Sequence, residues 1–472
     1  MSICDSGIGI KVLGKKIEID VADNHPLIVL ANALPWYEML EMILPDLKQS
    51  TPCRQWTRGR KLRVRIHLGA YILQTIYDLT DRDLESGLKE NGVYQLFCGR
   101  EIVARWHCPD HTKIEAFRSR LSPETQHRLA NLICQQAVSL GLANPGIVDI
   151  DSTVQESNMT YPTDAKMLRK LGNLAGTVAK NFENFVPGLQ KQGVNLTVNV
   201  KEIASKARSC FFLKKKEKAS IEEKSRVLTE LWQSVSEPVL RLVSIGNDYI
   251  KEAETKFPWH ARRALNQLLS HGENYLKSVK YFIDTGRADT QKRLSFHLSE
   301  VSCFNKNKEH KRYEFGRGFQ LVRLAGNVLF IQKSSTVRME DKETLGAVIE
   351  THEQLFGEGK IDSLATDKGY YSQKNMILLR EKGISTEGFQ QPDNIKTKNV
   401  HSDQEQEKLR NRRAGIEPLI GHIKCGGQLG RSRMKNDRNT ESSAYASVLG
   451  FNLRQISRML FDNDITIKLL TG

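Results

Sequence analysis

The chain has 472 residues, 39% of them hydrophobic, and its 70 lysine and arginine residues outnumber its 55 aspartate and glutamate residues by a net charge of +15. This length allows two or three structural units, and no apolar run approaches the roughly 18 residues of a membrane span. The N-terminal sequence has no signal-peptide pattern, so we expect a cytoplasmic protein. The basic excess favours a polyanionic partner, although an ordinary soluble protein can also be basic.

The first part of the chain is predicted to be helical. Residues 1–55 form a mixed N-terminal segment, and residues 56–140 have the pattern of a helical domain. Thr80 or Asp81 is a good N-cap for one helix, and Ser122 precedes another. This block opens with the basic sequence RGRKLRVR, which could contact phosphates or simply be solvated.

The composition changes after residue 140. The run 147–151 is apolar and β-branched, which predicts a buried strand. Residues 166–300 are helix-like again and too long for a loop, so we expect a helical insertion. The remainder predicts a hairpin around Ala325–Gly326, and then alternating helices and strands. The expected elements are a helix over 341–356, a strand over 361–366, a helix over 372–382, a strand over 384–388 and helices over 404–424 and 442–460.

Three acidic residues are candidate metal ligands. Asp151 is expected at the end of the first strand and Asp367 just after a later one, where the sites of α/β proteins form. Glu417 lies in a predicted helix. Carboxylate oxygens suit Mg²⁺ or Mn²⁺, and two such ions can activate water or a 3′-hydroxyl and stabilise a leaving oxygen. Each acid alone is more often a turn or cap residue, and Asp149, on the same strand face as Asp151, stays the alternative to it.

Basic residues surround Glu417 in the sequence. Arg413, Glu417 and Lys424 are spaced by four and then seven residues, which places them on one helix face, and Arg410 joins that face. An acid among cations suits a metal ligand beside DNA phosphates. The alternative is a solvated helix with ion pairs four residues apart. Pro418 argues against an unbroken surface helix because it can kink or restart it.

Four stretches of the chain resemble bacterial insertion-sequence transposases of the IS4/IS5 group. They are GRKLRVRIHLGAYILQTIYDLTDRDLESGLKENGVYQLFCG with CPDHTKIEAFRSRLS, DIDSTVQESNMTYPTDAKML, SLATDKGYYSQKN, and NRRAGIEPLIGHIKCGGQLGRSRMKND with LGFNLRQI. Together they reach from about residue 58 to residue 458 and leave 175–300 without a named motif. The helix signature of the group is Tyr, two residues, Arg, three residues, Glu, six residues and Lys. Arg413, Glu417 and Lys424 match this signature, whereas Arg410 stands in the Tyr position.

The resemblance implies an α/β RNase H-like catalytic domain, a mixed sheet flanked by helices, formed by residues 141–165 and 301–460. It implies that Asp151, Asp367 and Glu417 are catalytic residues that bind two Mg²⁺ or Mn²⁺ ions. It also implies a nucleoid-associated bacterial transposase that binds the terminal inverted repeats as a homodimer, with the N-terminal helices as the expected end-binding or scaffold domain. The enzyme would cleave the element ends and join each 3′-hydroxyl to target DNA.

Further DNA contacts and alternative functions remain open. Lys368 and Tyr370 lie beside the second acid and Arg317 lies in the hairpin, so all three are candidate DNA contacts, with packing as the alternative for the first two. A metal-dependent DNA nuclease of the same fold would cleave without strand transfer. An inactive, transposase-derived DNA-binding protein is a third possibility. A recombinase with a protein nucleophile has no residue set that rivals the three acids.

Overall fold

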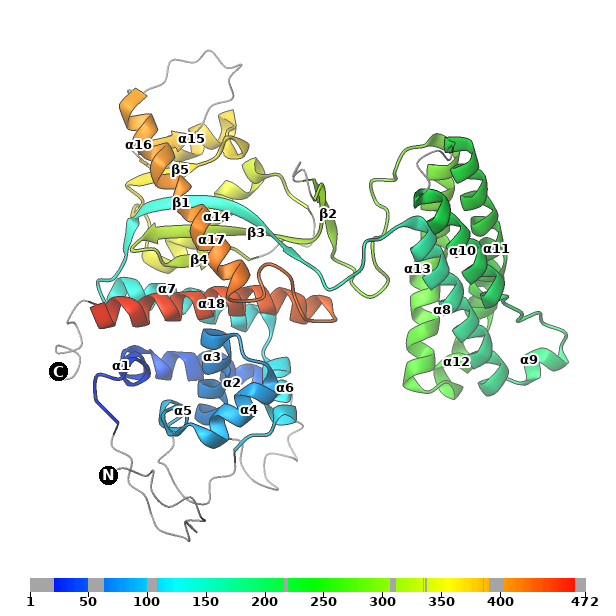
Figure 1. The fold of residues 1–472 in the computed structure, drawn as a ribbon, viewed down its shortest axis with the longest axis horizontal. Coiled ribbons are helices and arrows are strands. Elements are labelled where there is room, and N and C mark those ends of the chain that lie inside the picture. The colour runs from blue at the N-terminus through cyan, green and yellow to red at the C-terminus, as the bar shows by residue number, and fades with distance from the viewer. Residues whose placement is uncertain are drawn as a thin grey trace, which may run out of the picture. The chain divides into compact units, whose positions relative to one another are not determined.

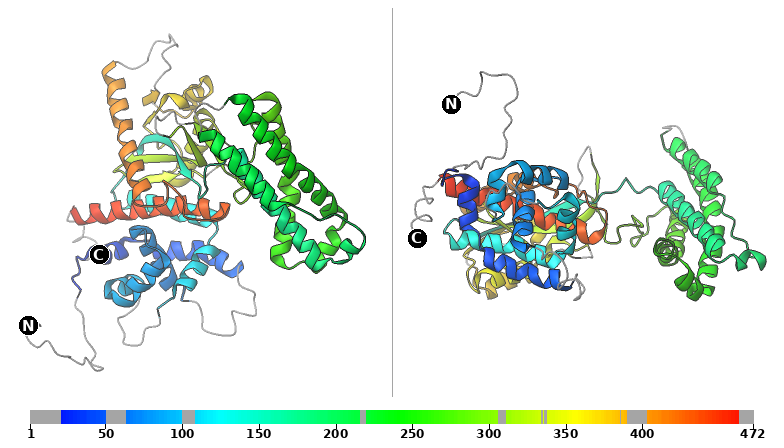
Figure 2. Two further views of the ribbon diagram at one scale, coloured as in Figure 1. Left: turned by 45° about the vertical axis from the view of Figure 1, so that its right-hand side comes forward. Right: turned by 90° about the horizontal axis from the view of Figure 1, so that it is seen from below.

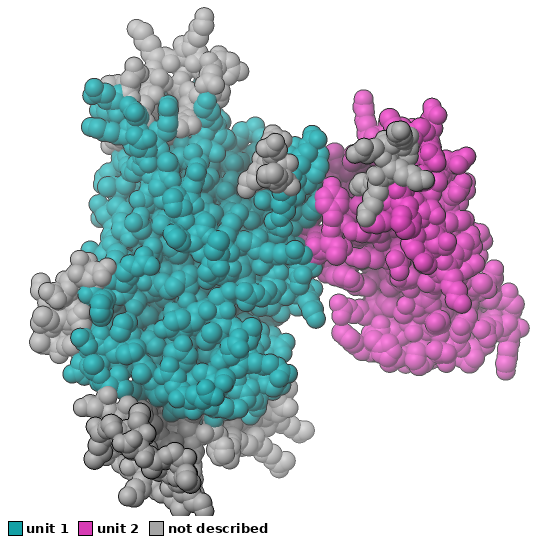
Figure 3. All heavy atoms as spheres, in the orientation of Figure 1, with its two compact units in different colours: residues 1–158, 303–472 teal, residues 159–302 magenta. Residues whose placement is uncertain are grey.

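The computed structural model describes residues 21–49, 63–99, 108–215, 220–305, 311–333, 335, 338–384, 386–389 and 403–462. It divides into two compact units, one of residues 1–158 with 303–472 and one of residues 159–302 (Figure 3). Residues 58–62 of the basic sequence RGRKLRVR lie outside the described residues. Within the described ranges no single helix is long and apolar enough to cross a membrane, and only the bent pair Pro26–Ala33 and Trp36–Lys48 reaches that length and composition together.

Helices precede the sheet in the first unit (Figure 1). The predicted caps are observed: the Thr80 hydroxyl accepts a hydrogen bond from the backbone N–H of Asp83, and the Ser122 hydroxyl accepts one from Thr125. Each bond satisfies a first-turn N–H that has no partner within the helix. The helices are α1 (Pro26–Ala33), α2 (Trp36–Gln49), α3 (Val64–Tyr77), α4 (Asp81–Glu90), α5 (Gly92–Phe97), α6 (His111–Arg120) and α7 (Pro123–Ser139).

The first unit contains a mixed sheet in the order β2-β3-β1-β5-β6, with β4 paired to β3. Strand β3 is antiparallel to β1, whereas β5 is parallel to β1 and β6 is parallel to β5. The strands are β1 (Asn144–Glu156), β2 (Ser302–Asn305), β3 (Tyr313–Ala325), β4 (Leu329–Ile331), β5 (Ser363–Thr366) and β6 (Thr386–Phe389). The hairpin expected at Ala325–Gly326 is confirmed as the β3–β4 turn, where Gly326 has a φ of 104°.

Two expectations about the sheet are wrong. Strand β1 does not end at Asp151, because its antiparallel pairing with β3 continues from Asp151↔Leu321 to Glu156↔Gly316. Asp151 is therefore an interior strand residue. Strand β2 was also not expected; its four residues lie partly exposed at the edge of the sheet, where the apolar pattern of a buried strand is absent.

Helices flank the sheet. They are α14 (Asp341–Phe356), α15 (Gln373–Glu381), α16 (Asp403–Ala414), α17 (Ile416–Cys425) and α18 (Asp437–Asp462), with a short 3-10 turn η2 (Lys368–Tyr370) after β5. The single helix predicted over 404–424 is divided into α16 and α17 at Gly415. Pro418 falls in the first turn of α17, where its missing N–H costs nothing, so the chain restarts a helix there.

One hydrophobic cluster joins the N-terminal helices to the sheet. It includes Leu73 of α3, Leu129 of α7, Phe330 of β4 and Tyr445 of α18, all fully or almost fully buried. Helix α18 packs on α3, α7 and β4. The helical block and the sheet therefore share one core within the first unit.

The second unit is a helical bundle. Helices α8 (Asp164–Phe185), α10 (Val200–Lys215), α11 (Ile221–Asp248) and α13 (Trp259–Thr285) lie side by side, as Figure 2 shows. The short helices α9 (Gly188–Lys191) and α12 (Ile250–Lys256) connect them. The apolar faces of the long helices form a separate core that includes Phe182, Leu242 and Tyr275. This bundle accounts for the helical pattern of the 166–300 region.

Candidate metal and nucleic-acid site

The sheet register brings Asp151 and Asp367 onto neighbouring strands. The parallel ladder of β1 and β5 pairs Val148 with Leu364 and ends at Asp149↔Ala365. Asp151 and Asp367 each lie two residues beyond this last pair, so they are at the same level past the end of the parallel pairing. Paired strands lie about 4.8 Å apart. The Asp367 carboxylate accepts a hydrogen bond from the Gly369 backbone N–H at 2.8 Å, which fixes it at the start of η2.

Arg413 connects Asp151 to Glu417. Its Nη2 atom lies 3.5 Å from Asp151 Oδ2 and 3.3 Å from Glu417 Oε1. The Asp151 side chain is 14% exposed and that of Glu417 is 61% exposed. The junction of α16 and α17 therefore brings the exposed Glu417 carboxylate to the Arg413 guanidinium, which also contacts Asp151.

The electrostatics agree with this convergence. Burial raises the pKa of Asp151 to about 6; the Arg413 charge opposes that rise, and the negative charges of Asp367 and Glu417 add to it. Carboxylates must lie near one another to act in this way. Asp151 therefore lies within electrostatic reach of the other two acids named from the sequence.

Asp149, the alternative to Asp151, has a different environment. Arg412 Nε donates to its Oδ1 at 2.7 Å, and Arg323 Nη1 lies 3.4 Å from its Oδ2. Burial raises the pKa of Asp149 and the Arg412 charge opposes this. Arg412 also donates to the Ser363 hydroxyl at 2.8 Å. Asp149 therefore anchors α16 to β1 and β5 through arginine pairs.

A fourth acid near this group was missed in the sequence. Asp341 begins α14, and a Cβ placed on Gly369 would lie 3.1 Å from Asp367 Oδ1 and 3.2 Å from Asp341 Oδ2. Gln320 Nε2 donates to Asp341 Oδ1 at 3.2 Å. An acid in the first turn of a helix is common because it stabilises the helix dipole, so Asp341 does not stand out in the sequence.

The candidate DNA contacts divide into two groups. Arg410 and Lys368 are exposed, and Lys424 is partly exposed in the last turn of α17. Arg317 does not join them: its side chain is 3% exposed and pairs with Glu441 at 2.7 Å, so the expected DNA contact is not supported. Tyr370 is fully buried and its hydroxyl donates to Gln320. Tyr370 is therefore a packing residue and not a DNA contact.

The basic N-terminal sequence also contains both a half-buried and an exposed arginine. Arg65 places its guanidinium 3.2 Å from the centre of the Trp36 ring and donates to the Phe97 carbonyl at 2.9 Å. Burial lowers the pKa of Arg65 to about 10. Its role is to hold α2, α3 and α5 together, whereas Arg63 is exposed.

The donor chemistry of the three acids fits a hard divalent cation, since all offer carboxylate oxygens. In the described part of the chain, however, no three His, Cys, Asp or Glu side chains stand close enough to hold one metal ion. The Arg413 guanidinium is the cation that lies between Asp151 and Glu417. Ligation by all three acids therefore requires side-chain movement around Arg413.

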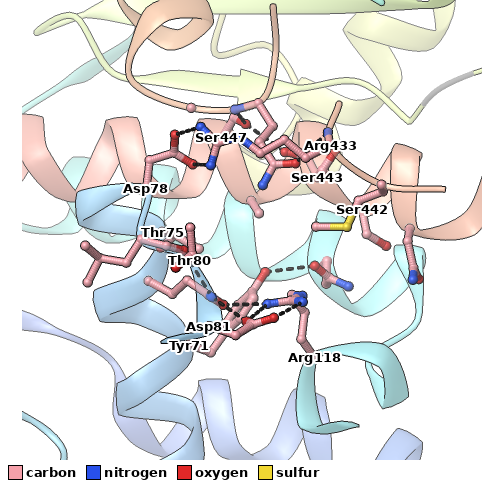
Figure 4. Close-up of a pocket in the computed structure, with 18 residues that line it drawn as sticks. Tyr71, Thr75, Asp78, Thr80, Asp81, Arg118, Arg433, Ser442, Ser443 and Ser447 are labelled. Atoms are coloured by element: carbon pink, nitrogen blue, oxygen red, sulfur yellow. Dashed lines mark hydrogen bonds and ion pairs between the residues drawn. The ribbon is translucent and has the colours of Figure 1, made fainter. Parts of the chain in front are cut away.

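A pocket of about 240 Å³ lies elsewhere in the first unit, between α3, α4 and α18 (Figure 4). Its charged groups are already paired. Arg118 Nη2 donates to Asp81 at 3.0 Å and Arg433 Nη2 donates to Asp78 at 2.7 Å. None of the three candidate acids lines it. The Arg118–Asp81 pair joins α6 to α4, and the Arg433–Asp78 pair connects the N-terminal helices to the C-terminal part of the chain.

Comparisons with known proteins bear on the class of protein. Residues 15–120 match the family model of a transposase domain (DUF772), which supports a transposase family for this chain. A 195-residue stretch is 25% identical to the uncharacterized protein ORF8 in the nfe locus of Rhizobium meliloti and covers 41% of this chain and 86% of that protein. No solved structure matches the chain.

Proposed function

We propose that this protein is a DDE transposase that cleaves the ends of its element and joins each 3′-hydroxyl to target DNA. The observation that carries the proposal is the placement of Asp151 on β1 and Asp367 at the end of the neighbouring β5, with Glu417 of α17 joined to Asp151 through the Arg413 guanidinium. The transposase-domain match over residues 15–120 supports the same class. The strand order, with β1 antiparallel to β3 and parallel to β5, supports an RNase H-like catalytic domain.

The three acids have distinct parts in this proposal. Asp151 is fixed inside a paired strand and Asp367 is fixed by the N–H of Gly369, so these two form the rigid side of the site. Glu417 stands on an exposed helix turn and completes it. Two Mg²⁺ or Mn²⁺ ions held by these carboxylates would activate the attacking oxygen and stabilise the leaving oxygen.

The basic side chains position the DNA. Arg413 contacts two of the acids, and Arg410, Lys368 and Lys424 lie on α16, η2 and α17, the elements that adjoin or carry the acids. Guanidinium and ammonium groups in these places hold phosphates beside the carboxylates. Residues 56–140 bind the terminal inverted repeats, and a homodimer holds the two ends.

The test uses the full chain and duplexes that carry the terminal repeats of its own element, with uncut and pre-cut ends. Asp151→Asn, Asp367→Asn and Glu417→Gln should each lower cleavage and joining by at least about a hundredfold, because loss of a residue that merely orients a metal ligand costs about 10–100-fold. DNA affinity should change little. Glu358→Gln, which alters an exposed carboxylate before β5, is the matched control and should keep full activity.

The outcomes separate the proposal from its alternatives. Joining of pre-cut ends by Asp151→Asn or Asp367→Asn at the wild-type rate would remove the catalytic assignment. Cleavage of uncut duplex by the wild type without any joining of pre-cut ends would identify a nuclease. Binding of the repeats without cleavage in Mg²⁺ or Mn²⁺ would identify an inactive DNA-binding protein.

A further inference from the structure

The helical unit of residues 159–302 carries most of the net positive charge of the chain. It contains 24 lysine and arginine residues and 15 aspartate and glutamate residues, an excess of nine within the total of +15. None of the candidate catalytic acids belongs to it. A basic unit favours contact with a polyanion, but a binding surface must be located before a partner can be named.

One exposed stripe runs along α13. It consists of polar and aromatic residues that recur every three or four positions, and we call it the α13 stripe: Trp259, Arg263, Asn266, Ser270, Asn274, Lys277 and Tyr281. This spacing places all of them on one helix face. At 1.5 Å per residue the stripe is roughly 33 Å long. The opposite face contributes Leu265, Leu268 and Leu276 to the bundle core.

Two adjoining hollows follow the α13 stripe. One of about 580 Å³ reaches from Trp259 to His271, and one of about 670 Å³ reaches from Ser270 to Arg293, so that Ser270 and His271 line both. The carboxylate that lines them is Asp289, which already accepts hydrogen bonds from the Ser278 hydroxyl and the Gln291 backbone N–H. A negatively charged strand along the hollows would therefore meet no unengaged acid among their lining residues.

Three guanidinium groups face these hollows without a carboxylate partner. Arg262 donates to a backbone carbonyl, Arg263 lies 5.5 Å from the centre of the Trp259 ring, and Nη1 of Arg293 is buried without a hydrogen bond. Among the described residues, no ion pair includes Arg262, Arg263 or Arg293. Guanidinium groups in this state are ready to bind phosphate oxygens.

Aromatic rings stand at both ends of the α13 stripe. Trp259 is 68% exposed and Tyr281 is 47% exposed. Large exposed rings beside cations are typical of surfaces on which unpaired bases stack while the backbone follows the charges. A second copy of the chain is a poorer occupant, because the stripe between the rings is polar and cationic, whereas a helix-pairing seam is apolar.

We propose that the α13 stripe and the two hollows beside it bind single-stranded DNA, with Trp259 and Tyr281 stacked on bases and Arg262, Arg263 and Arg293 on phosphates. The inference rests on the proposed function, because that function places cleaved DNA strand ends on the protein. The amide and hydroxyl groups of Asn266, Ser270 and Asn274 lie between the two rings. They offer hydrogen bonds to base edges of any sequence.

The test measures the affinity of the full chain for an oligothymidylate of about 15 nucleotides and for a duplex of equal length. Trp259→Ala should weaken the oligothymidylate complex at least about fivefold, as removal of one stacking ring does, and should leave the duplex complex nearly unchanged. Trp259→Phe keeps a stacking face and should restore most of the affinity. The Arg262→Ala, Arg263→Ala double variant should reduce the salt dependence by about 0.7 in log–log slope for each phosphate that the protein no longer neutralises.

Matched controls lie in the same unit but outside both hollows. Phe212→Ala removes an aromatic ring that is 63% exposed on α10, and the Lys251→Ala, Lys256→Ala pair removes two exposed cations on α12. Both controls should bind like the wild type. Equal reductions of affinity in the control and stripe variants, or a Trp259→Ala effect on sedimentation and not on DNA affinity, would overturn the proposal.

The outcome is distinguishable from failure of the proposed function. Asp151→Asn should bind oligothymidylate like the wild type, since Asp151 lies in the first unit. If the stripe variants lose oligothymidylate binding while the wild type neither cleaves nor joins DNA, the transposase proposal fails and the surface stands. If the acid variants abolish joining while the stripe variants bind normally, only the surface is wrong.

Discussion

The charge state of Asp151 links the site to the stability of the fold. Its carboxylate is mostly buried, and Arg413 offsets only part of the effect of burial on its pKa. Because the folded-state pKa of about 6 lies above the ordinary value of 3.8, the ionised group destabilises the metal-free protein above pH 6. The effect vanishes as the pH falls below the ordinary value, where the folded and unfolded states are both protonated.

Asp151→Asn should therefore stabilise the metal-free protein at neutral pH. The expected gain in the free energy of unfolding is at most about 3 kcal/mol, at about 1.4 kcal/mol for each pKa unit, and it should shrink as the pH approaches about 4. Urea unfolding at several pH values measures it. A gain that does not depend on pH, or a decrease in stability at neutral pH, would contradict this account of Asp151.

Arg413 is expected to oppose metal binding until DNA arrives. Its guanidinium contacts Asp151 and Glu417, and its positive charge repels a divalent metal ion at these carboxylates. Arg413→Gln should raise the affinity of the DNA-free protein for Mn²⁺ at least about tenfold, which corresponds to about 1.4 kcal/mol. Paramagnetic resonance of free Mn²⁺ measures this affinity directly.

Arg410 provides the matched control for Arg413. It is exposed on the same helix, and Arg410→Gln should leave the Mn²⁺ affinity unchanged. DNA should raise the Mn²⁺ affinity of the wild type, because its phosphates bind the Arg413 guanidinium and draw it away from the acids. The same DNA should raise the Mn²⁺ affinity of Arg413→Gln much less. Weaker Mn²⁺ binding by Arg413→Gln would mean that the arginine supports the metal site instead of competing with it.

The junction of α16 and α17 depends on Gly415. A Cβ there would lie 2.5 Å from Arg323 Nη1, which also meets Asp149. Gly415→Ala should turn the Arg323 guanidinium away from Asp149 and lower the free energy of unfolding by at most about 1.5–3 kcal/mol, the value of a hydrogen bond to a charged group, because a flexible side chain can move aside. Gly421→Ala, in α17 with nothing within 4 Å of its Cβ, should instead stabilise by about 0.5–1 kcal/mol. Equal changes in the two variants by chemical denaturation would refute the packing argument.

Elements with strong periodicity could be predicted from the sequence. The helix over 341–356 has the observed bounds, and the β3–β4 hairpin follows from the glycine at its turn. The length of β1 could not be predicted, because residues 152–156 are mostly polar and are held in the strand by pairing with β3. Pro418 indicated that the 404–424 helix could kink or restart, but not that the division would fall at Gly415.

The candidate site also has residues that could be predicted from the sequence and residues that could not. Asp151, Asp367 and Glu417 were named from expected strand ends, a basic helix and the family resemblance, and they stay a prediction; Asp151 lies inside β1, not at its end. Arg317 could not be excluded, because its partner Glu441 lies on α18. Asp341 could not be included, because only the fold brings α14 beside η2.

At the scale of the molecule, the two units have separate cores. The cluster that joins the helical block to the sheet contains no residue of 159–302. Replacement of residues 159–302 by a flexible glycine-serine linker should therefore leave a protein with one cooperative unfolding transition and wild-type Mn²⁺ binding. It should also lose affinity for oligothymidylate. A shortened chain that aggregates or unfolds without a transition would show that the bundle is required for the first unit to fold.

The central claim is that three distant carboxylates bind metal together, and the most direct measurement is the anomalous scattering of Mn²⁺ in crystals of the protein bound to DNA. We expect Mn²⁺ on Asp151 and Asp367, with Glu417 completing one site and Arg413 turned to a phosphate. Mn²⁺ bound elsewhere, or a Glu417 that stays away from both aspartates in the DNA complex, would contradict the proposed chemistry.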